Sequence, residues 1–371
     1  MNNEDVLLTI AIPTFNRHKL LKSQLCDIHK IINNNKFSSN VELLVSDNCS
    51  NDKTDDVVRN HSLLDKKYMF TTTKNNSNVG GDENFMIACL KSSGRFVWTL
   101  SDDDKLEDGA IEYVFTALSN NLNIGCGMVN YFITKKKDIT AIPNALGSEG
   151  YVVANNFDSF IREVLVRFSN ASSCIFRRSL LSEYAMKKSV GSAYPHLWWM
   201  ADLASSYPSL VIRRPIYTFI HPGVAETRIN SSKRETSKKE TSKKENYPFD
   251  FYLYAHLSVL KFNLYINKFL SSKKTKIKLY RLSLDENINQ IIFHKITVEK
   301  YDITAIAAAL KVMIRRFYFS PTFWIVHIPI LILPSSVAKF IEPYRWKYLE
   351  FRSSILTYVK NFYNALWKIW Q

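Results

Sequence analysis

Apolar and polar positions follow a regular alternation over the first 115 residues. Continuous apolar runs are typical of buried strands, and the stretches between them repeat apolar residues at helical spacing. The predicted strands are residues 6–12, 41–45, 68–73 and 96–100, and the predicted helices are residues 18–32, 54–64 and 84–92. Because strand and helix alternate, this region is expected to form a parallel α/β sheet.

The same pattern continues more loosely over the next hundred residues. It predicts a helix over 108–119, a strand over 125–133, a strand leading into a helix over 171–178, and a closing strand over 210–219. Together with the first region, these segments define an expected first domain over residues 1–225.

The chain changes character after this domain. Residues 226–246 contain Glu-Thr-Ser-Lys-Lys twice in tandem and have no apolar face, which favours a basic linker or lid, or else a solvated spacer. Residues 247–371 have helical periodicity and many aromatic residues. We therefore expect a third, helical and amphipathic region that faces a membrane.

Two segments carry the membrane expectation. The most apolar stretch, residues 322–334, is shorter than the ~20 residues that a spanning helix needs, so an interfacial, re-entrant or buried segment fits better. The final helix repeats apolar residues from Ile355 to Ile369 with Lys360 and Lys368 opposite. This composition is typical of a helix that lies in the membrane plane, and a buried core helix is the alternative.

Composition and charge narrow the function classes. A hydrophobic fraction of 46% excludes a disordered chain. Residues 1–112 carry 13 Lys/Arg and 17 Asp/Glu, a net charge of −4, whereas residues 113–371 carry 36 and 17, a net charge of +19. The second part is therefore expected to face an anionic partner: nucleic acid, a membrane surface or a phosphorylated substrate.

The cysteines and the N-terminus indicate the compartment. The five cysteines are widely spaced and contain no Cys-x-x-Cys pair, so neither a zinc site nor a disulfide framework is expected. The first residues are acidic and lack the apolar core of a secretory signal. A cytoplasmic protein is the interpretation that follows.

Three consecutive aspartates, Asp102, Asp103 and Asp104, follow the apolar run at 96–100. Adjacent carboxylates repel one another unless a cation lies among them, and a divalent cation that also binds phosphates is a common solution. In open α/β sheets, ligands bind beyond the carboxyl ends of the strands. The alternative is a solvated acidic turn.

Four motifs occur in one order and spacing: IPTFNR (12–17), VSDNCSND (45–52), NSNVGG (76–81) and LSDDD (100–104). In this combination the chain resembles glycosyltransferase family 2, and within it the abequosyltransferase-like branch of polysaccharide-assembly enzymes. The resemblance implies a GT-A fold, which is Rossmann-like with a mostly parallel sheet. It also implies a nucleotide-sugar donor and a divalent metal, Mg²⁺ or Mn²⁺.

The resemblance assigns roles to individual residues. Asp47 would accept hydrogen bonds from the nucleobase, and Asn78 and Gly80 would let the backbone approach the base and ribose. The residues implied to bind the nucleotide sugar are Pro13, Thr14, Asn16, Arg17, Asp47, Asn78, Gly80, Asp102 and Asp103. In the family's Asp-x-Asp motif, Asp104 and Asp102 are the implied metal ligands, and a register that pairs Ser101 with Asp103 is the alternative.

The catalytic base is harder to assign. An inverting enzyme of this family needs a group that deprotonates the acceptor hydroxyl, usually one of a Glu-Asp pair that this chain lacks. His196 and Asp202 are the candidates. A histidine has a suitable unperturbed pKa, but a packing role for His196 beside Trp198 and Trp199 is the alternative.

The resulting hypothesis is a metal-dependent, inverting glycosyltransferase. It would transfer a sugar from a nucleotide diphosphate to a hydroxyl of a polyprenyl-diphosphate-linked glycan in O-antigen or capsule synthesis, on the inner face of the cytoplasmic membrane. A basic nucleic-acid-binding protein and a non-catalytic scaffold are the alternatives. Nucleic acid is not expected because the first domain is acidic and has no recognition helix.

Overall fold

The structure is a computed structural model that describes residues 6–133, 142–143, 149–164, 170–192, 194–219, 259 and 261–282, with short stretches between 310 and 344. The chain divides into two compact units. One contains residues 1–241 and 265–279, and the other contains residues 242–264 and 280–371. The domain boundaries predicted at 225 and 246, and the tandem repeat between them, lie outside the described residues and stay predictions.

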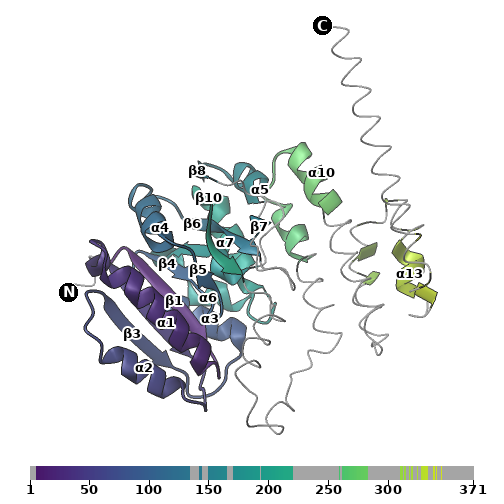
Figure 1. The fold of residues 1–371 in the computed structure, drawn as a ribbon. Coiled ribbons are helices and arrows are strands. Elements are labelled where there is room, and N and C mark those ends of the chain that lie inside the picture. Colours follow the sequence, from purple (N-terminus) through teal and green to yellow (C-terminus); the bar gives the residue numbers. More distant parts are fainter. Residues whose placement is uncertain are drawn as a thin grey trace. The chain divides into compact units, whose positions relative to one another are not determined.

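The first unit contains a ten-stranded sheet with the order β3-β2-β1-β4-β9-β6-β10-β5, in which β7 also pairs with β6 and β8 with β10 (Figure 1). The strands are β1 (Leu8–Thr14), β2 (Val41–Asp47), β3 (Met69–Lys74), β4 (Phe96–Thr99), β5 (Lys105–Leu106), β6 (Cys126–Ile133), β7 (Ile142–Pro143), β8 (Tyr151–Ala154), β9 (Cys174–Arg177) and β10 (Ser209–Phe219).

The sheet is mixed. The strands β3, β2, β1 and β4 are parallel, as the alternation over the first hundred residues predicts. The second half departs from the mostly parallel sheet, because β9 lies between β4 and β6 and is antiparallel to both. The strand β10 is parallel to β6 but antiparallel to β5 and β8. The apolar run at 174–176 gave no signal of strand direction.

The helices of this unit are α1 (His18–Asn33), α2 (Thr54–Ser62), α3 (Gly81–Lys91), α4 (Ala110–Ser119), α5 (Phe157–Val164), α6 (Glu183–Lys187) and α7 (Pro195–Ser206). The predicted helices at 18–32, 54–64, 84–92 and 108–119 are confirmed to within three residues at either end. Their apolar faces pack on the sheet: α1 and α4 share a buried core with β1 and β2, while α3 packs on β1 and β2 as well (Figure 1).

The first strand continues past the proline at which the apolar pattern predicts its end. Pro13 and Thr14 pair with Ser46 and Asp47 of β2. On the other side, β1 pairs with β4 only as far as Ala11. Pro13 has no backbone N–H to donate, and it occupies a part of the strand with a single neighbour, where prolines are tolerated. The strand therefore carries Thr14 to the edge of the sheet.

Beyond the sheet, the described residues form α10 (Lys273–Leu282) and the short helix α13 (Ile328–Ile332). Met313 and Phe317 are fully buried. No helix in the described part of the chain is both long and apolar enough to cross a membrane. The predicted in-plane helix at the C-terminus lies outside the described residues.

The buried histidine His61, near the end of α2, is expected to make the stability of the fold sensitive to acid. His61 and His29 both hydrogen-bond the hydroxyl of Tyr68, at 2.9 and 3.0 Å. Burial, with the nearby His29 and Lys66, lowers the pKa of His61 from 6.5 to about 4. Between these pH values the unfolded chain binds a proton that the folded chain does not, so stability rises with pH.

We therefore expect the free energy of unfolding to fall as the pH drops from 6.5 to 4, by at most about 1.4 kcal/mol per pH unit from this group. Urea unfolding of the wild type and of His61→Phe at several pH values measures the difference, which isolates this residue from other titrating groups. Parallel pH profiles for the two proteins would contradict the assignment.

Candidate active site

Three neighbouring parallel strands bring predicted site residues together at their carboxyl ends. Thr14 of β1 is in register with Asp47 of β2, and Asp47 is in register with Lys74 of β3. Adjacent strands in a sheet lie about 4.8 Å apart. The three side chains therefore form a row at one edge of the sheet, where the sequence places the nucleotide.

The aspartate run joins this row through Thr14 and Arg17. Thr14 Oγ1 donates to Asp102 Oδ2 at 2.7 Å, and Arg17 Nη1 donates to Asp102 Oδ1 at 2.9 Å. Asp102 is 3% exposed. Burial raises its pKa above the usual value, an effect that the Arg17 guanidinium opposes and the neighbouring Asp103 reinforces. A negative charge here thus depends on nearby cations.

The other two aspartates face different partners. Asp103 accepts hydrogen bonds from Ser101 Oγ and Arg17 Nη1, at 2.5 and 3.2 Å. Asp104 is 1% exposed and accepts from Ser172 Oγ at 2.6 Å. Burial raises the pKa of Tyr217 well above its usual value, and the negative charge of Asp104 adds to the shift. Asp102 and Asp104 are therefore buried, which a solvated acidic turn does not predict, while Asp103 is partly exposed.

The segment 171–173, whose Ser172 donates to Asp104, is attached to β4 by side chains. Trp98 Nε1 donates to the carbonyl of Ser172, and Thr99 Oγ1 donates to the carbonyl of Ala171, both at 2.8 Å. The Ser101 backbone N–H donates to Ser172 Oγ at 2.9 Å. The segment 171–173 therefore packs directly against the strand that ends in the aspartates.

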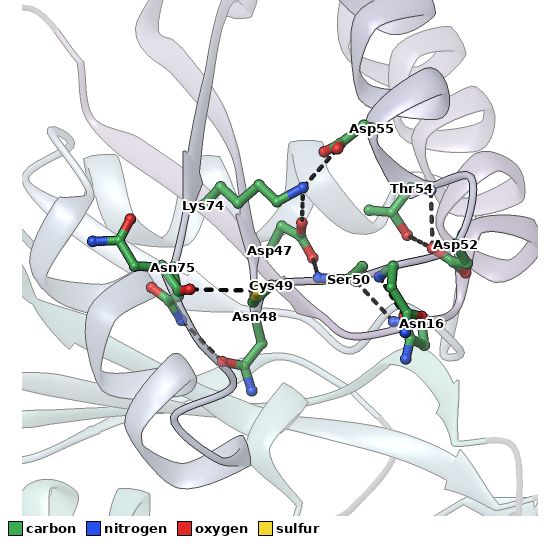
Figure 2. A network of polar contacts seen from close by, with 12 residues as sticks. Asn16, Asp47, Asn48, Cys49, Ser50, Asp52, Thr54, Asp55, Lys74 and Asn75 are labelled. Atoms are coloured by element: carbon green, nitrogen blue, oxygen red, sulfur yellow. Dashed lines mark hydrogen bonds and ion pairs between the residues drawn. The ribbon is translucent and has the colours of Figure 1, made fainter.

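Asp47 sits at the centre of a polar network (Figure 2). Its Oδ1 accepts a hydrogen bond from the Ser50 backbone N–H at 3.0 Å. Its Oδ2 lies 3.6 Å from Lys74 Nζ, which makes a shorter contact of 2.6 Å with Asp55. The Asp47 side chain is buried, and Oδ2 has no hydrogen-bond partner among the described residues.

Amide side chains fix the loop that contains Asn78 and Gly80. Asn48 Nδ2 donates to Asn78 Oδ1 at 2.7 Å, and the Val79 backbone N–H donates to Asn48 Oδ1 at 3.0 Å. Gly80, with φ at +89°, precedes α3 in a conformation that favours glycine. The predicted contact residues of this loop are thus tied to the end of β2.

The residues after β1 are also held by the loop after β2. Asn16 adopts a positive φ of 52°, and its backbone N–H donates to Ser50 Oγ at 2.8 Å. Its side chain accepts from the Asn51 backbone N–H at 2.9 Å. Pro13 lies one residue before Thr14 in β1. All predicted nucleotide-binding residues therefore belong to the carboxyl ends of β1 and β2 or to the loops that follow β1, β3 and β4.

The two base candidates lie on different faces of α7. His196 is 5% exposed, and its ring lies near Phe85 of α3 and Tyr194, with ring centres 5.8 and 6.0 Å apart. Asp202 is exposed and accepts a hydrogen bond from the Tyr265 hydroxyl. The structure does not bring these two residues together, so at most one of them can serve the same substrate.

The donor atoms of the aspartate run fit a hard divalent cation. Mg²⁺ is usually held by one or two carboxylates together with substrate phosphates and water. Within the described residues, no group of three or more His, Cys, Asp or Glu side chains forms a complete metal site. Three carboxylates in sequence, with Asp103 the most exposed of them, suit a metal that arrives with a diphosphate.

Some residues of the site had no signal in the sequence. Lys74 is a lysine at the end of a predicted strand, which is a common position for a solvated charge. Ser172 lies among small residues, Ala171 and Ser173, that match no motif. Arg17 was expected to bind nucleotide, but its link between Asp102 and Asp103 was not. Each depends on contacts between positions about 30 to 90 residues apart, which the local pattern does not specify.

Comparison with known proteins gives relatives of one kind. Residues 9–188 match glycosyl transferase family 2. The abequosyltransferase RfbV of Salmonella typhimurium is 29% identical over 218 residues, covering 53% of this chain and 61% of the relative. A GalNAc(5)-diNAcBac-PP-undecaprenol beta-1,3-glucosyltransferase of Campylobacter jejuni is 28% identical over 193 residues, covering 52% and 58%. The chain thus spans less than two thirds of either curated relative.

A solved structure shares the fold. S. aureus TarS 1–349, in complex with UDP-GlcNAc, superimposes with a TM-score of 0.57 at 15% identity, covering 94% of this chain and 92% of that chain. The expected GT-A-like α/β fold is confirmed at this level. The four motifs and the buried Asp102 and Asp104 agree with this match: residues 9–188, just under half of the chain, are similar to glycosyl transferase family 2.

Proposed function

We propose that the chain transfers a sugar from a nucleotide diphosphate donor to a hydroxyl group of a glycan. One observation carries the proposal: Thr14 stands in register with Asp47 and donates a hydrogen bond to Asp102. A base bound at Asp47 and a diphosphate bound at the aspartate run would then belong to one molecule, with the ribose beside Thr14. This arrangement suits a nucleoside diphosphate.

The residues around this row would hold the donor. Asn78 and Gly80 would present backbone to the base and ribose, and Asn16 and Pro13 would close the pocket from the β1 side. Arg17 bridges Asp102 and Asp103, so it already balances part of their charge. Its side chain is half-exposed, and it would also contact the diphosphate.

We propose Asp104 and Asp102 as the ligands of Mg²⁺ or Mn²⁺. Each carboxylate accepts a hydrogen bond from a different hydroxyl, Asp104 from Ser172 and Asp102 from Thr14. When bound, the metal would neutralise the charge that develops on the leaving nucleoside diphosphate. The hydroxyls of Ser172 and Thr14 would keep the two carboxylates oriented.

For the base we favour His196 over Asp202, because the carboxylate of Asp202 is already engaged by Tyr265 on the exposed face of α7. A histidine in this position would take the proton of the acceptor hydroxyl as it attacks the sugar, with inversion at the anomeric carbon.

His196→Gln is therefore expected to lower kcat about a hundredfold with little change in the donor KM. Asp202→Asn is expected to keep kcat within about threefold. Steady-state kinetics of the two variants make the comparison, with thermal melting to check folding. The reverse ranking, with Asp202→Asn the inactive variant, would transfer the role to Asp202.

The acceptor is proposed to be a glycan on a polyprenyl diphosphate, reached from the membrane surface. Residues 261–282 contain seven Lys/Arg and no Asp/Glu. Within the first unit, this segment is attached through Asp158, which accepts from the Ser271 and Ser272 backbone N–H groups at 2.8 and 3.0 Å. Basic segments of this kind bind anionic lipid surfaces. Co-sedimentation with vesicles that contain anionic lipid tests this part.

Thermal stabilisation by nucleotide sugars tests the central proposal. A ligand at about 100 times its dissociation constant adds roughly 2.7 kcal/mol to the stability of the folded state. At least one of the UDP-, dTDP-, GDP- or CDP-sugars is expected to raise the melting temperature in the presence of Mg²⁺ or Mn²⁺. Absence of any shift, combined with salt-sensitive binding to DNA, would favour a nucleic-acid-binding protein instead.

A further inference from the structure

Arg17 binds two carboxylates of the aspartate run, and one of them belongs to a proposed metal ligand. We propose that Arg17 is a built-in counter-ion that occupies Asp102 until the donor binds, and that it moves to the diphosphate when Asp102 accepts the metal. This role rests on the proposed function, since the metal must bind at the aspartate run. It makes Arg17 a positioning residue that couples metal binding to nucleotide binding.

Both oxygens of Asp102 are engaged in the structure. Arg17 Nη1 donates to Oδ1 at 2.9 Å, and Thr14 Oγ1 donates to Oδ2 at 2.7 Å. The same Nη1 lies 3.2 Å from Asp103 Oδ2, so a single guanidinium nitrogen bridges two carboxylates. Asp102 is buried, and a buried carboxylate stays charged only with a cation beside it. Arg17 supplies that charge while no metal is bound.

Arg17 and a divalent cation compete for Asp102. A metal ion on this carboxylate would come next to the guanidinium that already donates to it. Two cations bound to one carboxylate repel each other, and the repulsion is strongest where the carboxylate is buried. Binding of the metal to Asp102 therefore requires that the guanidinium withdraw.

Arg17 can change partners while the backbone keeps its place. It is the N-cap residue of α1, and its carbonyl accepts from the Leu21 N–H at 3.0 Å. Its side chain is 49% exposed, so the guanidinium that leaves Asp102 stays in contact with water. A diphosphate offers oxygens that match a planar guanidinium. Arg17 therefore gains a partner from the donor as it gives up Asp102, which Thr14 continues to orient.

The test is the affinity of the full chain for Mn²⁺, measured from the paramagnetic resonance signal of the free ion, alone and with UDP, dTDP, GDP or CDP. Arg17→Gln is expected to bind Mn²⁺ alone at least about tenfold more tightly than the wild type, because the competing cation is gone. Nucleotide should then strengthen Mn²⁺ binding about tenfold less in Arg17→Gln than in the wild type.

Two variants serve as controls. Arg17→Lys keeps a point charge that can replace the single bridging nitrogen, and its affinity for Mn²⁺ alone should stay within about threefold of the wild type. Lys19→Gln removes an exposed lysine two residues further along α1, and it should change this affinity by less than about twofold because its charge is screened. Thermal melting shows whether each variant is folded.

A measurement on the wild type does not depend on the folding of Arg17→Gln. The ¹⁵N signal of the Arg17 guanidinium, assigned by its loss in Arg17→Lys, is expected to shift when nucleoside diphosphate is added without metal. An unshifted signal overturns the inference. So does a folded Arg17→Gln variant that binds Mn²⁺ alone no more tightly than the wild type, or an equal gain in Lys19→Gln. If Mn²⁺ binds to none of these proteins with any of the four nucleotides, the proposed function itself fails.

Discussion

Asp104→Asn is expected to lower the rate of sugar transfer at least about a hundredfold, which corresponds to roughly 2.7 kcal/mol of transition-state stabilisation. The substitution keeps the size of the side chain and an oxygen that can accept from Ser172 Oγ. It removes one negative charge from the proposed metal ligands. The measurement is release of nucleoside diphosphate from the nucleotide sugar that stabilises the chain most, together with the affinity for Mn²⁺ in the presence of that nucleotide.

Asp108→Asn is the matched control for Asp104→Asn. It makes the same chemical change four residues further along the chain, on an exposed side chain outside the cluster. Turnover within about twofold of the wild type is expected for this control. Both variants should melt within a few degrees of the wild type. An Asp104→Asn variant that retains more than a third of the activity would rule out a metal-binding or transition-state role for this carboxylate.

Glu42→Ala is expected to reduce the free energy of unfolding by about 3 kcal/mol or more. Glu42 is 1% exposed in β2, and its carboxylate accepts four hydrogen bonds: from Thr9 Oγ1, Thr71 Oγ1, and the backbone N–H and Oγ of Ser93. It makes no ion pair within the described residues. Removing the carboxylate leaves one buried donor, Thr9 Oγ1, and three part-buried donors unpaired, and a buried donor left unpaired costs about 1–3 kcal/mol.

Two further variants make the Glu42 prediction specific. Glu42→Gln keeps one acceptor oxygen and is expected to cost less than Glu42→Ala, about 1–2 kcal/mol. Glu112→Ala removes an exposed glutamate in the first turn of α4 and is expected to cost at most about 1 kcal/mol. Urea denaturation compares the three. Equal values for Glu42→Ala and Glu112→Ala would show that the buried network contributes nothing to stability.

The part of the fold that sequence predicts well is the part with the strongest periodicity. The apolar runs of β1, β2 and β4 and the amphipathic face of α1 are buried as their patterns require. The positions of Asp47 and Asp102 to Asp104 follow from the same reasoning, because they lie at or just beyond the carboxyl ends of the parallel strands β2 and β4.

What the sequence does not predict depends on contacts between distant segments. The antiparallel insertion of β9 between β4 and β6 is fixed by tertiary pairing, since an apolar run of four residues has no preferred direction. Glu42 looks like an interruption of an apolar strand until Thr9, Thr71 and Ser93 converge on it. The ion pair between Asp47 and Lys74 and the hydrogen bond between Asp104 and Ser172 also join segments that are distant in the sequence.

The anchoring of segment 171–173 to β4 by Trp98 and Thr99 has a kinetic consequence. Groups that are locked before a ligand arrives lose little conformational entropy when it binds. Segment 171–173, next to the aspartates, is held in this way before the donor binds. Trp98→Phe removes one of its hydrogen bonds and is expected to raise the dissociation rate of the donor complex, while the association rate stays unchanged.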